Sequence, residues 1–257
     1  MSMMMNRKDW YLSNQSGNDD NSNVPLQLCK IYLSKYKELD NKGKLEFKTY
    51  LNTVVSELTP SCKIPKVGTT SYNNIQGIAL FFSMVAKSGL IFNDSYRSLN
   101  IKQHFNDCID ESAIMRSSRS DRNETFRSTY GGEASLNFSS NANLQKELED
   151  KLGFEVINSG HNSYLYYDKE CSSINMHVDR KEYEINVLVK LSHTFKNGQR
   201  SKLILWDSNL GPIENEIPIG NVLAFHANGT IHGRLECADD EKITLLSMGF
   251  VPKQIDL

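Results

Sequence analysis

The spacing of hydrophobic and polar positions divides the chain into a helical first part and a β-rich second part. Between residues 25 and 88, apolar side chains recur every three or four residues, which is the period of an amphipathic helix. This pattern predicts helices over Leu26–Tyr36, Leu45–Leu58 and Ile75–Ser88, which we expect to pack on the outside of a sheet. Breaks at residues 40–43, Pro60 and Gly89 end them.

The middle of the chain has the least regular pattern. Asn93–Ala142 is polar and contains several arginines, among them Arg127, and a short helix follows over Ala142–Leu152. Arginines of such a loop can bind an acidic substrate. An ordinary solvated surface loop explains the same composition and is the favoured interpretation.

From residue 154 onward, short apolar runs alternate with turn residues, as in an antiparallel sandwich or barrel. Lys202–Trp206 is a typical run. The complete set of predicted strands is Phe154–Asn158, Ser163–Tyr167, Ile174–Val178, Tyr183–Leu191, Lys202–Trp206, Val222–His226 and Ile243–Val251.

Together these elements predict an α+β protein whose core is mainly β. Residues 1–23, rich in Asn, Ser and Asp, are expected to form a mobile polar segment. Residues 24–257 are expected to form one domain, with helical support and a variable loop over 24–152 and the β core over 153–257.

Composition narrows the possible partners. The chain carries 29 basic and 31 acidic residues, a net charge of −2, which gives no reason to expect a nucleic acid partner. No apolar run is long enough to cross a membrane, and the N-terminus lacks the apolar core of a signal peptide. The sequence gives no indication of oligomeric state.

The five cysteines are scattered and form no CxxC pair. They therefore indicate neither a zinc ribbon nor a disulfide framework. Reduced thiols are typical of the cytoplasm, so we expect a cytoplasmic protein.

The strongest candidate for chemistry is His177 with Asp179. Alternate side chains of a strand point to the same face, so a His-x-Asp spacing places an imidazole and a carboxylate together. Two histidines and one carboxylate on one side of an ion are typical of non-haem Fe(II) sites. His232 is the expected third ligand, with His226 as its rival.

The passage from Gly220 to Arg234, GNVLAFHANGTIHGR, and the basic Lys242 ten residues after His232 complete a known motif. It consists of HxD, a distal His about fifty residues later, and a basic residue about ten further on. In these features the last hundred residues resemble the Fe(II)/2-oxoglutarate-dependent oxygenase superfamily. The resemblance implies a double-stranded β-helix, that is, a cupin-like jelly roll, with flanking N-terminal helices.

The resemblance also implies cofactors and an activity. His177, Asp179 and His232 would hold Fe(II), with 2-oxoglutarate and O₂ as co-substrates. The enzyme would be a dioxygenase that releases succinate and CO₂. Halogenating relatives lack the carboxylate ligand, so Asp179 favours hydroxylation, desaturation or cyclisation.

A cation must bind the far carboxylate of 2-oxoglutarate. The motif assigns this role to Lys242, with Thr244 as a hydroxyl donor and Arg234 as the competing anchor. Lys offers a point charge where the more usual Arg offers a planar fork. A tyrosine of the preceding strand, Tyr164 or Tyr166, is also expected to contact the co-substrate.

The prime substrate is less determined. Arg180, Asn186 and Arg127 are the candidate substrate-binding residues. Chain length and near-neutral charge favour a small molecule, such as an amino acid or a metabolite derived from one. The alternatives are a protein or peptide hydroxylase of the same superfamily, or a non-catalytic cupin-type protein that binds a metal or a small molecule.

Overall fold

A computed structural model of the chain describes residues 24–95, 101–118, 121–122, 127–196 and 200–253. The polar segment predicted over residues 1–23 lies outside the described residues. Within them, no helix is both long enough and apolar enough to cross a membrane. All five cysteines are buried, and none of them is in a disulfide.

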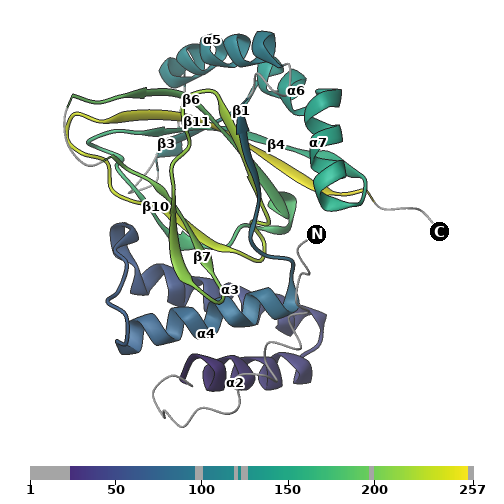
Figure 1. The fold of residues 1–257 in the computed structure, drawn as a ribbon, viewed down its shortest axis with the longest axis vertical. Helices are drawn as coiled ribbons and strands as arrows, with labels where there is room; N and C mark the ends of the chain where they lie inside the picture. The colour runs from purple at the N-terminus through teal and green to yellow at the C-terminus, as the bar shows by residue number, and fades with distance from the viewer. Residues whose placement is uncertain (1–23, 96–100, 119–120, 123–126, 197–199, 254–257) are drawn as a thin grey trace, which may run out of the picture.

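Helices come mainly from the first part of the chain and strands mainly from the second (Figure 1). The helices are α2 (Val24–Glu38), α3 (Asn41–Leu58), the 3-10 turn η2 (Pro60–Cys62), α4 (Thr70–Val85), α5 (Lys102–Ser118), α6 (Glu133–Ser139), α7 (Ala142–Leu152) and the 3-10 turn η3 (Lys181–Tyr183). The strands are β1 (Leu90–Ser95), β2 (Asp121–Arg122), β3 (Arg127–Tyr130), β4 (Val156–Tyr167), β5 (Ile174–His177), β6 (Ile185–Thr194), β7 (Leu203–Asp207), β8 (Gly211–Asn215), β9 (Asn221–Phe225), β10 (Ile231–Arg234) and β11 (Lys242–Pro252).

The strands form two antiparallel sheets. The large sheet has the order β1-β9-β6-β11-β4-β3-β2, and the small sheet has the order β5-β10-β7-β8. Every described pairing within them is antiparallel. Consecutive strands switch between the sheets, as β4, β5, β6 and β7 do in turn, so the two sheets face each other.

A separate set of helices covers the outer face of each sheet (Figure 1). Helices α5, α6 and α7 pack on the large sheet, where residues such as Phe138 and Phe250 form a fully buried cluster. Helices α3 and α4 pack on the small sheet near Trp206, and α2 packs on α4 around Phe81. The Trp206 indole also donates a 2.7 Å hydrogen bond from Nε1 to Gln76 Oε1 of α4, so its polar atom has a partner in the core.

Local sequence accounts for where these helices begin and end. The Asp40 side chain accepts a hydrogen bond from Gly43 N at 2.7 Å and so caps the start of α3. Asn141 caps α7 in the same way, and Gly153 ends that helix in the left-handed conformation that glycine favours. Residues 40–43, which we predicted as a break, therefore also start the next helix.

The structure confirms the predicted mainly β core with N-terminal helices. The irregular structure predicted for Asn93–Ala142 is wrong, because the segment contains α5, β3 and α6. The hydrophobic periodicity of α5 is weak, and this helix is held by packing on the large sheet. Strands β1, β2 and β3 also join the large sheet from before residue 153, so the β core begins earlier than predicted.

The aromatic cluster under the small sheet gives a test of this packing. Phe81 is fully buried and makes edge contacts with Tyr36 and Phe47. We expect Phe81→Ala to lower the free energy of unfolding by about 3–5 kcal/mol, because it leaves a cavity among rings. Urea denaturation measures the change. The exposed Ile31, changed to Ala, is the control and should cost far less.

Candidate functional site

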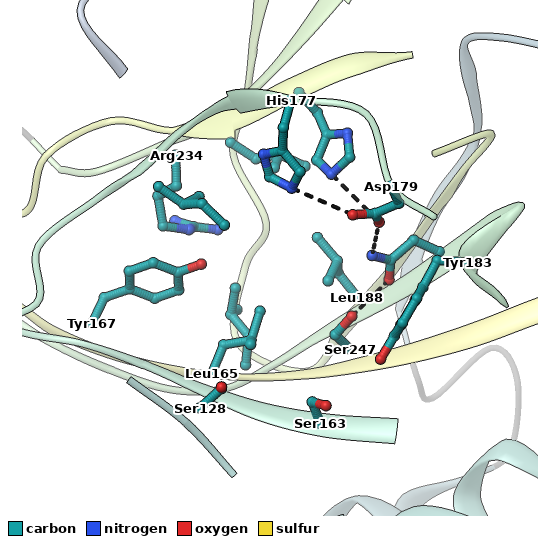
Figure 2. A pocket seen from close by; sticks show the side chains of 15 residues that line it. Ser128, Ser163, Leu165, Tyr167, His177, Asp179, Tyr183, Leu188, Arg234 and Ser247 are labelled. Carbon is teal, nitrogen blue, oxygen red and sulfur yellow. Dashed lines mark hydrogen bonds and ion pairs between the residues drawn. The ribbon is translucent and has the colours of Figure 1, made fainter. Parts of the chain in front are cut away.

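Two histidines and one aspartate meet between the sheets (Figure 2). Strands β5 and β10 are antiparallel neighbours in which His177 lies opposite His232, and Asp179 follows His177 by two residues. His177 Nε2 lies 3.3 Å from Asp179 Oδ1, and His232 Nε2 lies 3.5 Å from Asp179 Oδ2. One potential ligand atom of each residue lies within 4.8 Å of the others, so the three can hold one metal ion.

Backbone carbonyls fix the tautomer of both imidazoles. His177 Nδ1 lies 2.7 Å from Asn175 O, and His232 Nδ1 lies 2.9 Å from Thr230 O. A carbonyl oxygen only accepts, so each Nδ1 carries the proton and donates. Nε2 is then the nitrogen of each ring that faces Asp179, and it is the atom free to bind a metal once its proton is displaced.

The three groups also favour an ionised carboxylate. Burial alone would raise the pKa of Asp179, but His232 and His177 outweigh burial and hold that pKa well below its usual range. Burial likewise opposes protonation of His177, yet its contacts with Asp179 raise the pKa of that imidazole. Two imidazole nitrogens and one carboxylate oxygen on one side of a cavity fit the donor set of a non-haem Fe(II) site.

A short hydrogen-bonded chain from the large sheet holds the carboxylate (Figure 2). Ser247 Oγ of β11 donates to Asn186 Oδ1 at 2.9 Å, and Asn186 Nδ2 of β6 donates to Asp179 Oδ2 at 2.9 Å. Both Asn186 and Ser247 are buried. Because Asn186 binds Oδ2, Oδ1 is the oxygen better placed to bind a metal.

The site opens into a cavity of about 210 Å³ between the two sheets. One end contains Arg234 and Tyr167, and the other contains Asp179 and Tyr183 (Figure 2). The lining residues are Ser128, Ser163, Leu165, Tyr167, Ile174, His177, Asp179, Tyr183, Asn186, Leu188, Leu203, His232, Arg234, Leu245 and Ser247. Most of the walls are therefore apolar or carry hydroxyl groups.

Arg234 is a buried cation with unused donors. Its side chain is 1 % exposed, and its guanidinium lies 5.2 Å from the centre of the Tyr167 ring. Nη1 donates to Ser201 O at 3.4 Å, whereas Nε and Nη2 have no hydrogen-bond partner among the described residues. Buried donors normally have partners, so these two atoms indicate an anionic ligand at this end of the cavity.

A buried polar chain adjoins the Arg234 end. Glu241 accepts hydrogen bonds from Ser201 N at 3.0 Å and from His193 Nε2 at 2.6 Å. His193 Nδ1 lies 3.3 Å from Lys190 Nζ. Burial, followed by the charge of Arg234, lowers the pKa of Lys190 to about 8. Two cations with a single buried carboxylate near them make this end favourable for an anion.

Comparison with solved structures identifies the architecture. The chain is similar to the non-haem α-ketoglutarate-dependent epimerase SnoN of nogalamycin biosynthesis, with a TM-score of 0.53, 12% identity and coverage of 65% of this chain and 77% of the other. It is also similar to a prolyl-4-hydroxylase from Pseudomonas putida, with a TM-score of 0.50, 11% identity and coverage of 68% and 99%. No protein-family model and no curated protein matches the sequence.

The chain therefore has the fold of the 2-oxoglutarate-dependent oxygenases. At the level of the fold, this confirms the resemblance that the HxD, the distal His and the basic residue indicated. The two facing antiparallel sheets are the expected jelly roll.

In this oxygenase fold, the expected anchor residues do not lie where the motif predicted. Lys242 is exposed at the start of β11 and does not line the cavity. Thr244 is buried but is also absent from the lining, because Leu245 and Ser247 of the same strand face inward. The competing anchor, Arg234, does line the cavity.

The predicted tyrosines also face the wrong way. Tyr164 and Tyr166 belong to the cluster under α5, where Tyr164 Oη donates to Glu111 at 2.7 Å and Tyr166 Oη donates to Ser112 O at 2.8 Å. Because side chains of a strand alternate between faces, Ser163, Leu165 and Tyr167 of β4 face the cavity instead. The tyrosine of β4 that lines the cavity is Tyr167, which the sequence prediction did not include. In the sequence, it could have been found only from its even spacing from Ser163, which places both side chains on the same face of the strand.

Of the three candidate substrate-binding residues, one lines the cavity and two do not. Asn186 lines the cavity but binds Asp179. Arg127 points away from the inward-facing Ser128 and forms an ion pair with Glu170 at 3.6 Å. Arg180 is exposed and absent from the lining, since it begins the turn η3 after the HxD.

The chain from Ser247 to Asp179 predicts an effect on metal binding. We expect Asn186→Leu to weaken binding of Co(II), measured by its visible absorbance, roughly tenfold, because the carboxylate loses its support. Ser247→Ala should have a smaller effect in the same direction. Ser192→Ala, an exposed position on β6, is the control. Unchanged Co(II) affinity in Asn186→Leu would contradict this role.

Proposed function

We propose that the protein is an Fe(II)- and 2-oxoglutarate-dependent dioxygenase that hydroxylates a small molecule. The observation that carries the proposal is the convergence of His177, Asp179 and His232 in a cavity that also contains the buried Arg234, whose Nε and Nη2 have no hydrogen-bond partner among the described residues. The two histidines and the aspartate suit a metal ion, and Arg234 suits a carboxylate. The fold shared with an α-ketoglutarate-dependent epimerase and a prolyl-4-hydroxylase supports the same proposal.

The protein's own side chains would divide the work. His177, Asp179 and His232 would hold Fe(II) from one side, and Asn186 would keep the Asp179 carboxylate in place. O₂ would be the oxidant: with Fe(II) and 2-oxoglutarate bound, one oxygen atom would enter succinate, which forms with CO₂, and the other would enter the substrate. Because Asp179 occupies the carboxylate position, we favour hydroxylation, or the related desaturation or cyclisation, over halogenation.

Arg234 would bind the far carboxylate of 2-oxoglutarate. Its free Nε and Nη2 offer two donors, and two parallel hydrogen bonds from a guanidinium suit a carboxylate. Tyr167 would support the guanidinium from one side. Leu203 and Leu245, which line the cavity, would exclude water and so strengthen the charge pairing.

The end of the cavity away from Arg234 would receive the prime substrate. Tyr183 and Ser163 supply hydroxyl groups there, and Leu188 supplies apolar surface. Such walls suit a small molecule with both apolar and hydrogen-bonding parts. Amino acids and their derivatives remain the first class to screen, by substrate-stimulated release of succinate. If no amino acid stimulates succinate release, a peptide is the alternative substrate. We also propose a cytoplasmic location.

The activity has a direct test. After anaerobic reconstitution, Fe(II) and 2-oxoglutarate together should produce a weak visible absorption band, and exposure to O₂ should release succinate. We expect Asp179→Ala to lose both, because it removes one metal ligand while the sheets remain paired. If the native protein gives neither signal, it is a non-catalytic binding protein of cupin type.

The anchor assignment is tested by removing one cation at a time. We expect Arg234→Met to weaken 2-oxoglutarate binding by at least roughly thirtyfold, since the loss of a buried charged partner costs about 2 kcal/mol or more. Lys242→Met, which removes an exposed cation, should leave binding within twofold. Calorimetric titration of the metal-loaded protein measures both, and the opposite ranking would restore Lys242 as the anchor.

A further inference from the structure

The strand that carries His177 lies at the edge of its sheet. Strand β5 pairs with β10 on one side only, because the order of the small sheet is β5-β10-β7-β8. An edge strand has unpaired backbone donors and acceptors on its outer side and is free to shift unless something covers them. Two metal-site residues, His177 and Asp179, depend on the position of this strand and the residue after it.

Side chains of the N-terminal helices occupy the open edge. Asn52 of α3 accepts a 2.7 Å hydrogen bond at Oδ1 from Val178 N and donates from Nδ2 to Val178 O at 3.3 Å. Thr59, which is fully buried at the end of α3, accepts at Oγ1 from Met176 N at 3.2 Å. The amide of Asn52 thus makes the pair of bonds that a neighbouring strand would make.

A third contact extends the same edge. The Asn175 side chain accepts from Ser61 N at 2.9 Å and lies 3.3 Å from Ser56 Oγ. Ser61 has a φ of 51°, in the left-handed region that residues other than glycine seldom adopt. The carbonyl of Asn175 is also the group that accepts from His177 Nδ1. Helix α3 and the turn after it therefore form hydrogen bonds with Asn175, Met176 and Val178.

We propose that Asn52 is a positioning residue for the metal centre, holding His177 and Asp179 in place through the backbone of Val178. Val178 is the single residue between the two ligands, so a shift of its peptide groups moves both. The other side of this segment is fixed by Asp179 N, which donates to Ala227 O at 3.0 Å. Helix α3 thus takes the place of a neighbouring strand at the open edge of β5. This gives a role in the metal site to the N-terminal helices, which the oxygenase motif does not cover.

This inference rests on the proposed metal site, and the following test distinguishes a failure of the Asn52 role from a failure of the metal site itself. Co(II) is titrated anaerobically into the purified full-length protein, without 2-oxoglutarate, and followed by visible absorbance. The melting temperature is measured in parallel with EDTA present. We expect Asn52→Leu to weaken Co(II) binding roughly tenfold or more, as changes beside metal ligands commonly do. The Asn52→Leu variant leaves Val178 N and Val178 O without the hydrogen bonds from Asn52, while it keeps a side chain of similar size.

Val54→Ala is the matched control. Val54 lies on the same helix and packs against the cluster under the small sheet, without a described hydrogen bond to β5. It should lower the melting temperature and leave Co(II) affinity within twofold of the native protein. A purely structural role for Asn52 predicts the same behaviour for Asn52→Leu, and that result would overturn the inference.

Asn52→Asp keeps the test decisive if Asn52→Leu does not fold. This variant retains the shorter bond from Val178 N and loses the donor to Val178 O, so we expect an intermediate, roughly threefold, loss of Co(II) affinity. Native-like affinity in Asn52→Asp would overturn the role of the amide donor. Absence of Co(II) binding by the native protein would instead overturn the proposed function and this inference with it.

Discussion

The pairing of β5 with β10 is the constraint on which the candidate site depends. Its register places His177 directly opposite His232, which brings the two imidazoles within 4.4 Å between ring centres. Side chains of a strand alternate between faces, so a slip of one residue would turn His177 out of the cavity toward the helices. The chemistry therefore requires that the register of one short edge strand be held firmly.

The two sheets hold the site from both sides. The small sheet supplies the histidines, while the large sheet supplies Asn186 and Ser247, which reach across to Asp179. The separation between the sheets is set by apolar side chains such as Leu188 and Leu223, which form a buried cluster between them. Packing of the sheets thus determines the position of the carboxylate, and the helices outside each sheet keep that packing in place.

Strand alternation explains which predicted residues lie in the cavity. The sequence placed a tyrosine-rich strand before the HxD, but inward and outward parity could not be assigned, and Tyr164 and Tyr166 turned out to face α5. For Lys242, the spacing from His232 was suggestive, yet the residue stands at the exposed start of β11. Arg234 occupies the cavity because it lies two residues after His232 on the same strand, and hence on the same face.

The sequence by itself determined the class of the fold and the pairing of His177 with Asp179, because both depend on local patterns: the period of two in strands, the period of the first helices, and the HxD spacing. The third residue, His232, came from the resemblance to a family motif and not from a local pattern. The sequence did not determine the helix α5 within residues 93–142, the cation that faces the cavity, or the support of β5 by Asn52 across 126 positions. Those features depend on which distant segments pack together. Only the tertiary structure decides them, because burial and pairing between remote segments leave no periodic trace in the chain.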